Sequence, residues 1–318
     1  MNQLQRTIEI SIVIPVFNEE HTIPELYSRL TNSVKKVSDN YELIFVNDGS
    51  KDHSLTVLKQ FAEKDSHIKY ISFSRNFGHQ IAVTAGFNYC RGNTVVIIDA
   101  DLQDPPELIK ELYEKMKEGY DVVYAKRKSR QGESFLKKLT AKAFYRILSK
   151  ITTVDIPLDT GDFRIISRKI VNVLNKMPEQ HKFLRGQISW VGFKQTFIEY
   201  DRAERVAGKT GYTYRKMIKF AIDGITSFSN FPLKFATITG FLFSIIAFLL
   251  MLYTLYSRFI SRIYQPGWAS LMITVLFIGG IQLIGIGVIG EYVSRLSDNV
   301  RNRPLFIVNE TNVDGAEE

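Results

Sequence analysis

The sequence of 318 residues contains a single cysteine, Cys90. One thiol excludes a disulfide framework, and the lack of a CxxC step or a His/Cys cluster excludes the common zinc sites. A reducing, cytosolic setting is therefore the expectation. The GxGxxG turn of dinucleotide-binding folds and the GxxxxGK[ST] loop of P-loop ATPases are also missing, which disfavours both classes. Because 45% of the residues are hydrophobic and 23% are charged, the chain resembles neither a disordered nor a collagen-like protein.

Charge is absent from two long stretches, one between Lys234 and Arg258 and one between Arg262 and Glu291. Each exceeds the roughly 20 apolar residues that a helix needs to cross a hydrocarbon layer about 30 Å thick. As buried core helices, two such runs in succession would need a large soluble core around them. We therefore predict a C-terminal transmembrane hairpin within residues 233–292. The two predicted spans are residues 235–256 and 268–290.

The distribution of basic residues predicts how the hairpin is oriented. Lys and Arg are more frequent on the two flanks of the hairpin than in its link, so both termini are expected in the cytoplasm, in a multi-pass protein of the plasma membrane. The net charge of +8 indicates attraction to anionic lipid, and no nucleic-acid-binding motif is present. The predicted regions are a cytoplasmic domain (1–210), an amphipathic interfacial linker (211–232), the hairpin (233–292) and a cytoplasmic tail (293–318).

Two basic amphipathic segments are candidates for helices that lie in the membrane interface, Ser134–Ile151 and Tyr212–Phe228. For the first segment, an ordinary surface helix packed on the core is an equal alternative. The second directly precedes a predicted span, which favours the interface. Glycines in the second span leave grooves that suit packing within the hairpin or between subunits of a homo-oligomer.

The first two thirds of the chain alternate between short β-branched runs and helical patterns. This alternation predicts an α/β fold, with a mostly parallel sheet and helices on both of its faces. Asp104 is expected to cap the last of the helices. The predicted strands are Ile8–Phe17, Tyr41–Val46, Ile68–Phe73, Thr94–Ile98 and Asp121–Ala125. The predicted helices are Thr22–Val37, Asp52–Lys64, His79–Cys90 and Asp104–Lys117.

Acidic side chains follow three of the predicted strands. Glu19 follows the first, Asp48 follows the second, and Asp99 and Asp101 follow the fourth. Parallel sheets bind ligands beyond the carboxyl ends of their strands, so these carboxylates are expected to converge on one edge. Alternate residues of an extended segment point the same way, which lets Asp101 and Gln103 share a face. Such oxygen ligands suit Mg²⁺ or Mn²⁺, although an Asp-x-Asp step alone is more often a solvated loop.

Six segments together resemble a known enzyme family. In chain order they read IVIPVFNEE, VNDGS, SRNFG, DADLQDPPE, YAKR and TGDFR. This set resembles the GT-A glycosyltransferases of family 2. With two spans after it, the chain resembles the polyprenyl-phosphate hexosyltransferases, such as bactoprenol glucosyltransferases and dolichyl-phosphate mannose synthases. DADLQDPPE is the most specific segment, and the resemblance extends from about Ile8 to Pro304.

The resemblance implies a role for each matching residue. The nucleotide sugar is expected at Pro15, Phe17, Glu19, Asp48 and Asp99. The divalent cation is expected at Asp99, Asp101 and Gln103. The reaction is expected to depend on Asp101, Asp162, Arg127 and Arg164. The acceptor phosphate is expected at Arg130, Arg205 and Lys209. The family's usual final Lys of the last motif is replaced by Gly211, a departure for which Lys209 is a candidate substitute.

The implied reaction moves a hexose from a nucleotide diphosphate sugar to a polyprenyl phosphate by direct displacement, which inverts the anomeric centre. UDP-glucose is the first donor considered and UDP-N-acetylglucosamine the second. Asp162 is better interpreted as a positioning group than as a base, although both roles stay open. A processive polysaccharide synthase is the nearest alternative, but Gln187-Ile188-Ser189-Trp190 lacks the Arg of the Gln-x-x-Arg-Trp segment. A non-catalytic membrane scaffold is a more distant alternative.

The histidines show no ligand-like spacing to one another or to cysteine. We therefore interpret all of them as structural or surface residues. They are His21, His53, His67, His79 and His181.

Overall fold

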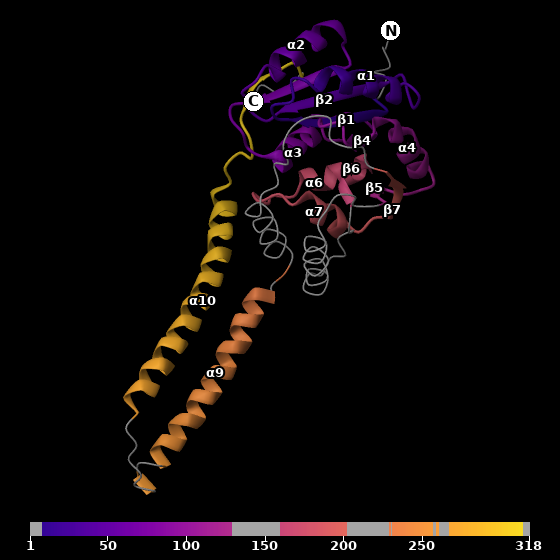
Figure 1. Ribbon diagram of the computed structural model, residues 1–318. Helices are drawn as coiled ribbons and strands as arrows, with labels where there is room; N and C mark the ends of the chain where they lie inside the picture. The colour runs from indigo at the N-terminus through magenta and orange to yellow at the C-terminus, as the bar shows by residue number, and fades with distance from the viewer. Residues whose placement is uncertain are drawn as a thin grey trace.

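A computed structural model describes residues 8–128, 160–201, 229, 231–256, 259–260 and 267–313. A domain built on one sheet carries a hairpin of two long helices, α9 (Phe231–Tyr256) and α10 (Trp268–Arg301), which projects from one side of it (Figure 1). The polypeptide returns to the sheet after α10, so that its last described residues lie beside the first three strands. The amphipathic segments Ser134–Ile151 and Tyr212–Phe228 lie outside the described residues.

The described residues form a single eight-stranded sheet in the order β7-β5-β6-β4-β1-β2-β3-β8. Its centre is parallel, since β1 pairs in parallel with both β2 and β4, and β2 with β3. β5 and β7 are also parallel, whereas β6 and β8 run antiparallel to their neighbours. The strands are β1 (Ile10–Val16), β2 (Tyr41–Asn47), β3 (Ile68–Phe73), β4 (Thr94–Ile97), β5 (Val122–Arg127), β6 (Thr160–Ser167), β7 (Gln195–Tyr200) and β8 (Val308–Thr311).

Helices cover both faces of the sheet, as the alternating pattern predicts. One apolar core lies between the sheet and α1 (Ile23–Val34), α2 (Ser54–Lys64) and α4 (Ile109–Lys117). A second core lies between the opposite face and α3 (His79–Tyr89), α6 (Arg168–Asn175) and α7 (Leu184–Val191). Because both faces are covered, β1 and β2 are buried along their whole length and are largely apolar. The five predicted strands and four predicted helices are confirmed, with ends that differ by a few residues.

The predicted helix cap at Asp104 is wrong. The helix begins instead with a short 3₁₀ turn, η1 (Pro106–Leu108), and its first residues carry no side-chain cap. Asp104 is completely buried, and its Oδ1 accepts a hydrogen bond from the hydroxyl of Tyr200 at the end of β7. The Asp104 carboxylate therefore binds Tyr200 of the edge strand β7 and does not cap the helix.

Among the described residues, two helices are long and apolar enough to cross a membrane. The apolar windows are Phe231–Leu250, with a mean hydropathy of 2.1, and Ile273–Arg301, with a mean hydropathy of 2.2. Most large apolar side chains on both helices are exposed, as is usual for surfaces that contact lipid. The predicted pair of long apolar helices is confirmed, although α9 begins earlier and α10 ends later than the predicted spans. The orientation across a membrane remains a prediction.

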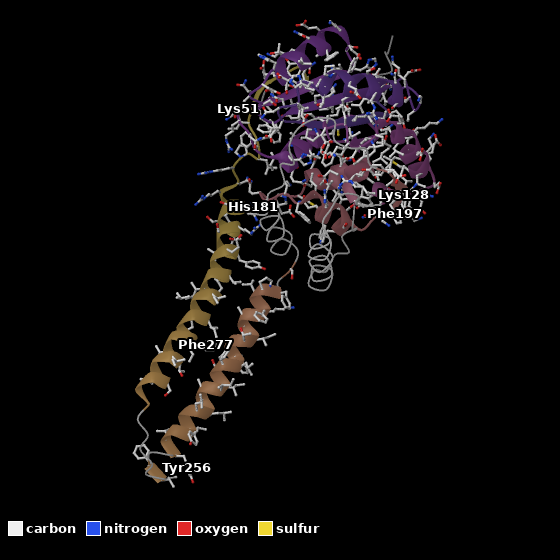
Figure 2. All side chains as sticks on the ribbon, in the orientation of Figure 1. Lys51, Lys128, His181, Phe197, Tyr256 and Phe277 are labelled. Atoms are coloured by element: carbon white, nitrogen blue, oxygen red, sulfur yellow. The ribbon has the colours of Figure 1, made fainter. Side chains whose placement is uncertain are left out.

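The end of α10 is fastened to the sheet domain at two places. Asn299 Oδ1 accepts a hydrogen bond from the backbone N–H of Gln180 at 2.9 Å, and Asp298 lies 3.0 Å from His181 Nε2. Figure 2 shows His181 beside this end of α10, with Tyr256 at the far end of the hairpin. Beyond α10, β8 adds an edge strand to β3, and Phe306 stacks on Phe73 at a ring distance of 5.0 Å. This return of the tail to the sheet is not evident from the sequence.

Candidate active site

The loop after β2 is organised around one buried aspartate. Asp48 is 3% exposed and accepts hydrogen bonds from the backbone N–H of Phe77 at 2.7 Å, the N–H of Gly78 at 2.9 Å and the side-chain amide of Asn76 at 2.9 Å. Burial raises the pKa of Asp48, although the two N–H donors act against that rise. We call Asp48, Asn76, Phe77 and Gly78 the Asp48 cluster. It fixes the loop that follows β3 against the loop that follows β2.

The loop after β1 lies next to the Asp48 cluster. The backbone N–H of Asn18 donates to Ser50 Oγ at 2.9 Å, and that of Glu19 donates to Ser54 Oγ at 2.9 Å. The Phe17 ring beside them is 44% exposed, and Pro15 lies within buried β1. The structure thus brings together the ends of β1 and β2, where a nucleotide is predicted to bind. An exposed aromatic ring at this edge is able to stack on a base.

The ends of β4 and β6 hold a second group of charged side chains. Asp162 Oδ2 lies 3.1 Å from His79 Nε2, and Asp162 Oδ1 accepts hydrogen bonds from Arg185 Nε at 3.0 Å and Arg164 Nη2 at 3.2 Å. Asp99 Oδ1 lies 3.7 Å from His79 Nε2. We call these five residues the Asp162 cluster. They come from β6, from the first residue of α3, from the end of β4 and from the first turn of α7.

The charges of the Asp162 cluster shift its ionisation. Desolvation alone lowers the pKa of His79, but the charge of Asp99 and the hydrogen bond with Asp162 outweigh it and raise that pKa to about 9. Burial raises the pKa of Asp99 to about 6, against the opposing charge of His79. Burial also acts to raise the pKa of Asp162, yet Arg185, His79 and Arg164 hold it well below its usual range. At neutral pH, Asp162 is therefore a carboxylate neutralised by its neighbours.

The Asp99 side chain has the properties of a cation ligand. Its Oδ1 is inaccessible to solvent and finds no hydrogen-bond partner within the described part of the chain. One ligand atom from each of Asp99, His79 and Asp162 lies within 4.8 Å of the others. Asp101 follows two residues later, and its Oδ1 accepts the backbone N–H of Gln103 at 3.1 Å. A buried carboxylate oxygen without a partner, in acidic surroundings, fits a divalent cation.

The orientation of the Arg127 side chain is set by contacts with Tyr200, Asp104 and Gly161. Its Nε lies 3.4 Å from the Tyr200 hydroxyl, and its Nη2 lies 3.8 Å from Asp104 Oδ1. A Cβ on Gly161 would stand 2.9 Å from Arg127 Nη2, so the absence of a side chain at that position lets the guanidinium cross β6 beside Asp162. Arg127 therefore lies next to Gly161, the neighbour of Asp162, and its role in the reaction stays a prediction.

Arg164 is almost completely buried beside Asp162. It is 1% exposed, and it donates to the carbonyl oxygens of Gly161 at 2.8 Å and Asp162 at 3.1 Å, as well as to the Asp162 carboxylate. Its guanidinium therefore supports the backbone around Asp162, and its Nη1 is buried without a hydrogen-bond partner among the described residues.

Sequence reasoning missed two members of the Asp162 cluster, His79 and Arg185. His79, interpreted from the sequence as a structural or surface residue, is exposed and contacts both Asp162 and Asp99. Its position directly after SRNFG, at the edge where the strands end, is a signal that was available. Arg185 lies in a segment with no recognised motif, and only the fold brings it to Asp162. The predicted ligands Arg130, Arg205 and Lys209 lie outside the described residues.

Comparison with known proteins identifies the family. The sequence profile of Glycosyl transferase family 2 matches residues 11–174, more than half of the chain. The chain belongs to glycosyl transferase family 2. It is 52% identical over 308 residues to an uncharacterized glycosyltransferase of Bacillus subtilis, covering 97% of this chain and 95% of that protein. It is 41% identical over 304 residues to the bactoprenol glucosyl transferase of Shigella phage SfII, covering 96% and 98% of the two chains.

This glycosyltransferase also resembles solved structures of the same fold type. One is a glucosyl-3-phosphoglycerate synthase from Mycobacterium tuberculosis in complex with Mn²⁺, UDP and phosphoglyceric acid, with 18% identity and a TM-score of 0.45 over 69% of this chain and 76% of that chain. The mixed, mostly parallel sheet of the family 2 enzyme is of the GT-A type. The part of the chain that the family profile matches includes Asp48, Asp99 and Asp162, whereas Arg185 lies beyond it.

Proposed function

We propose that this glycosyltransferase transfers a hexose from a nucleotide diphosphate sugar, with UDP-glucose as the first donor, to a polyprenyl phosphate such as undecaprenyl phosphate. The product is a lipid-linked sugar for glycosylation of the cell envelope. The observation that carries the proposal is the 41% identity to a bactoprenol glucosyl transferase, which extends over 96% of the chain and so includes the hairpin as well as the sheet domain.

The charge of the acceptor explains why the site needs no strong base. A phosphate monoester has a second pKa of about 6, so it is mostly a dianion at neutral pH and already a nucleophile. The pKa of Asp162 is held well below its usual range by Arg185, His79 and Arg164, against the effect of burial, which makes it a weak base. We infer that Asp162 positions the cations around it, and that the phosphate oxygen displaces the nucleotide directly with inversion at the anomeric carbon.

The donor is proposed to bind across the ends of β1, β2 and β4. Phe17 offers a ring for the base, and the Asp48 cluster fixes the loops that surround the nucleoside. Asp99, with Asp101 and Gln103, would hold Mg²⁺ or Mn²⁺, which supplies positive charge next to the departing diphosphate. Arg127 is the described arginine that we assign to the phosphates, because its guanidinium lies beside Asp162 and is partly exposed.

The membrane hairpin supports a lipid acceptor. α9 and α10 project from one side of the sheet domain (Figure 1), so a lipid in the same bilayer would approach the catalytic domain from that side. We propose that both termini and the catalytic domain lie in the cytoplasm, where nucleotide sugars are made. A hairpin of two helices offers no wide channel, which argues against a processive polysaccharide synthase.

A transfer assay tests the function. The purified full-length protein would be mixed with undecaprenyl phosphate, MgCl₂ or MnCl₂, and radiolabelled UDP-glucose, UDP-N-acetylglucosamine or GDP-mannose in parallel reactions. Label that moves into the organic phase with UDP-glucose, as a glycosyl phosphate of inverted configuration by NMR, is the expected result. Transfer from UDP-N-acetylglucosamine alone would correct the donor. No transfer from any donor would refute the lipid acceptor, and full activity in EDTA would refute the cation.

A further inference from the structure

Three arginines lie around Asp162 and its neighbour Gly161, and they come from three different elements. Arg127 comes from β5, Arg164 from β6 and Arg185 from α7. Arg164 is 1% exposed and donates to two carbonyl oxygens, so it acts on the polypeptide itself. The Arg185 side chain is 24% exposed, and its Nε donates to Asp162 Oδ1 at 3.0 Å. Arg185 therefore combines contact with the centre of the site and access to solvent.

The position of Arg185 is linked to the membrane hairpin through the segment before α7. The backbone N–H of Gln180 binds Asn299 of α10, and the Gln180 side-chain amide donates to the carbonyl oxygen of Arg303 at 2.9 Å. α7 itself is anchored where the N–H of Leu184 donates to Gln80 Oε1 at 3.1 Å. Figure 1 shows α6 and α7 on the side of the sheet from which the hairpin extends. α7, which carries Arg185 in its first turn, thus lies on the side from which a membrane lipid would arrive.

The charges around Arg185 favour a further anion. Desolvation and the charge of Arg185 act to lower the pKa of Arg127, but Asp104 and Tyr200 outweigh them and raise it. Arg185 therefore lies close enough to Arg127 for the two guanidinium groups to repel each other. Asp162 contacts Arg185, Arg164 and His79, while Asp104 lies 3.8 Å from Arg127. A dianionic phosphate between Arg127 and Arg185 would compensate this repulsion, and a guanidinium is able to donate two parallel hydrogen bonds to phosphate oxygens.

We propose that Arg185 binds the phosphate of the lipid acceptor, together with Arg127, while Asp162 holds the Arg185 guanidinium in place from the opposite side. This proposal rests on the proposed function and extends it to a residue beyond the segment that the family profile matches. The two guanidinium groups recognise the phosphate by its charge and geometry, and the prenyl chain stays in the membrane.

Steady-state kinetics of the full-length enzyme test the assignment. Undecaprenyl phosphate and UDP-glucose would be varied separately for the wild type, Arg185→Gln and Arg185→Lys. Loss of a charge-assisted contact is expected to raise the KM for undecaprenyl phosphate about tenfold to a hundredfold in Arg185→Gln, and less in Arg185→Lys, which keeps the charge but loses the planar fork. The KM for UDP-glucose is expected to stay within twofold of the wild type.

Arg29→Gln is a matched control. Arg29 donates from Nε and Nη2 to the two oxygens of Glu107 at 2.9 and 2.8 Å, remote from the Asp162 cluster, so its removal should change neither KM. A fall in kcat with an unchanged KM for undecaprenyl phosphate would show that Arg185 only supports Asp162, and would overturn the proposal. If Arg185→Gln does not fold, Arg185→Lys decides alone by the same criterion. A wild type without transfer to lipid would instead refute the proposed function.

Discussion

Two aspartates follow the two strands that flank β1 in the sheet, yet their surroundings are opposite. Asp48, after β2, accepts hydrogen bonds on both oxygens from three groups of the loop after β3. Asp99, close after β4, has an Oδ1 that is buried without a hydrogen-bond partner among the described residues. Burial raises the pKa of both carboxyl groups, but only for Asp48 do backbone N–H donors oppose it.

This difference indicates that one aspartate stabilises the fold and that the other binds a ligand. A carboxylate whose oxygens are satisfied by the backbone stabilises the fold and offers little to a ligand, whereas a buried oxygen without a partner destabilises the fold until a ligand arrives. We therefore assign the Asp48 cluster to the architecture of the nucleotide side, and Asp99 to contact with the cation. Substitution of Asp48 is therefore expected to affect stability, and substitution of Asp99 is expected to affect catalysis.

The largest effect is expected from Asp99→Asn. An amide is a poor ligand for a divalent cation, so transfer should fall by a hundredfold or more, which corresponds to about 3 kcal/mol of transition-state stabilisation. The free energy of unfolding should stay the same or rise, because the substitution removes a buried charge without a hydrogen bond on Oδ1. Transfer kinetics and thermal unfolding of the same preparation measure both. A large loss of stability would show that Asp99 supports the fold instead.

Asp48→Asn should reduce stability, in contrast to Asp99→Asn. An Asn side chain presents only one acceptor oxygen to the three donors of the Asp48 cluster, so the free energy of unfolding should fall by about 1–3 kcal/mol. Affinity for UDP-glucose should weaken because the loops around the nucleoside loosen, while the affinity for Mn²⁺ should not change. Thermal unfolding and Mn²⁺ titration distinguish the outcomes. Unchanged stability together with lost donor binding would make Asp48 a direct ligand of the nucleoside.

The sequence predicts the architecture more completely than the site. The strands from Ile10 to Ala125 are recognised because burial on both faces of the sheet makes them largely apolar, and the two long helices are recognised because each contains a long run without charge. The edge strand β8 is four residues long and half-exposed, so its sequence carries no such run. It is held by side-chain bonds such as those from Asn312 to the Tyr70 N–H and the Ile68 carbonyl.

Within the site, residues inside a recognisable motif are located and residues outside one are not. Asp99 and Asp162 belong to family segments, and the structure places both near one centre. His79 and Arg185 reach the same centre because α3 and α7 begin at the sheet edge, a fact of topology that spacing along the chain does not contain. Burial of Arg164 is equally hidden, since the charged residue reads as a surface group until β6 is placed between β4 and β5.

Two glycines allow the nucleotide side and the acceptor side of the site to be compared, Gly49 next to Asp48 and Gly161 next to Asp162. Gly49 has a φ of +65°, and a Cβ there would stand 2.4 Å from the carbonyl carbon of Arg75, so Gly49→Ala must move backbone. It should cost at least about 1–3 kcal/mol of unfolding free energy. A Cβ on Gly161 meets only the end of the flexible Arg127 side chain. Gly161→Ala should therefore keep its stability but reduce transfer about tenfold, by displacing that guanidinium.

These two variants are compared by thermal unfolding and by the KM for undecaprenyl phosphate. Gly161→Ala should raise that KM, and Gly49→Ala should not raise it beyond the effect of partial unfolding. Equal losses of stability in the two variants would mean that the acceptor side is as rigidly built as the Asp48 cluster, and would remove the distinction between the sides.

The smallest effect is expected from two tyrosines that make the same kind of bond in different places. Tyr113 donates to Glu9 Oε1 at 2.8 Å, remote from the site, and Tyr200 donates to Asp104, beside Arg127. Each Tyr→Phe substitution removes a phenol-to-carboxylate hydrogen bond and should cost about 1–3 kcal/mol of unfolding free energy. Only Tyr200→Phe should also reduce transfer, about threefold to tenfold, because Arg127 loses the group that aims it. Transfer rates measured at a temperature where both variants are folded distinguish a loss of stability from a misplaced Arg127 guanidinium. If the two variants transfer equally well, Arg127 is positioned by Asp104 and Gly161 without help from the phenol.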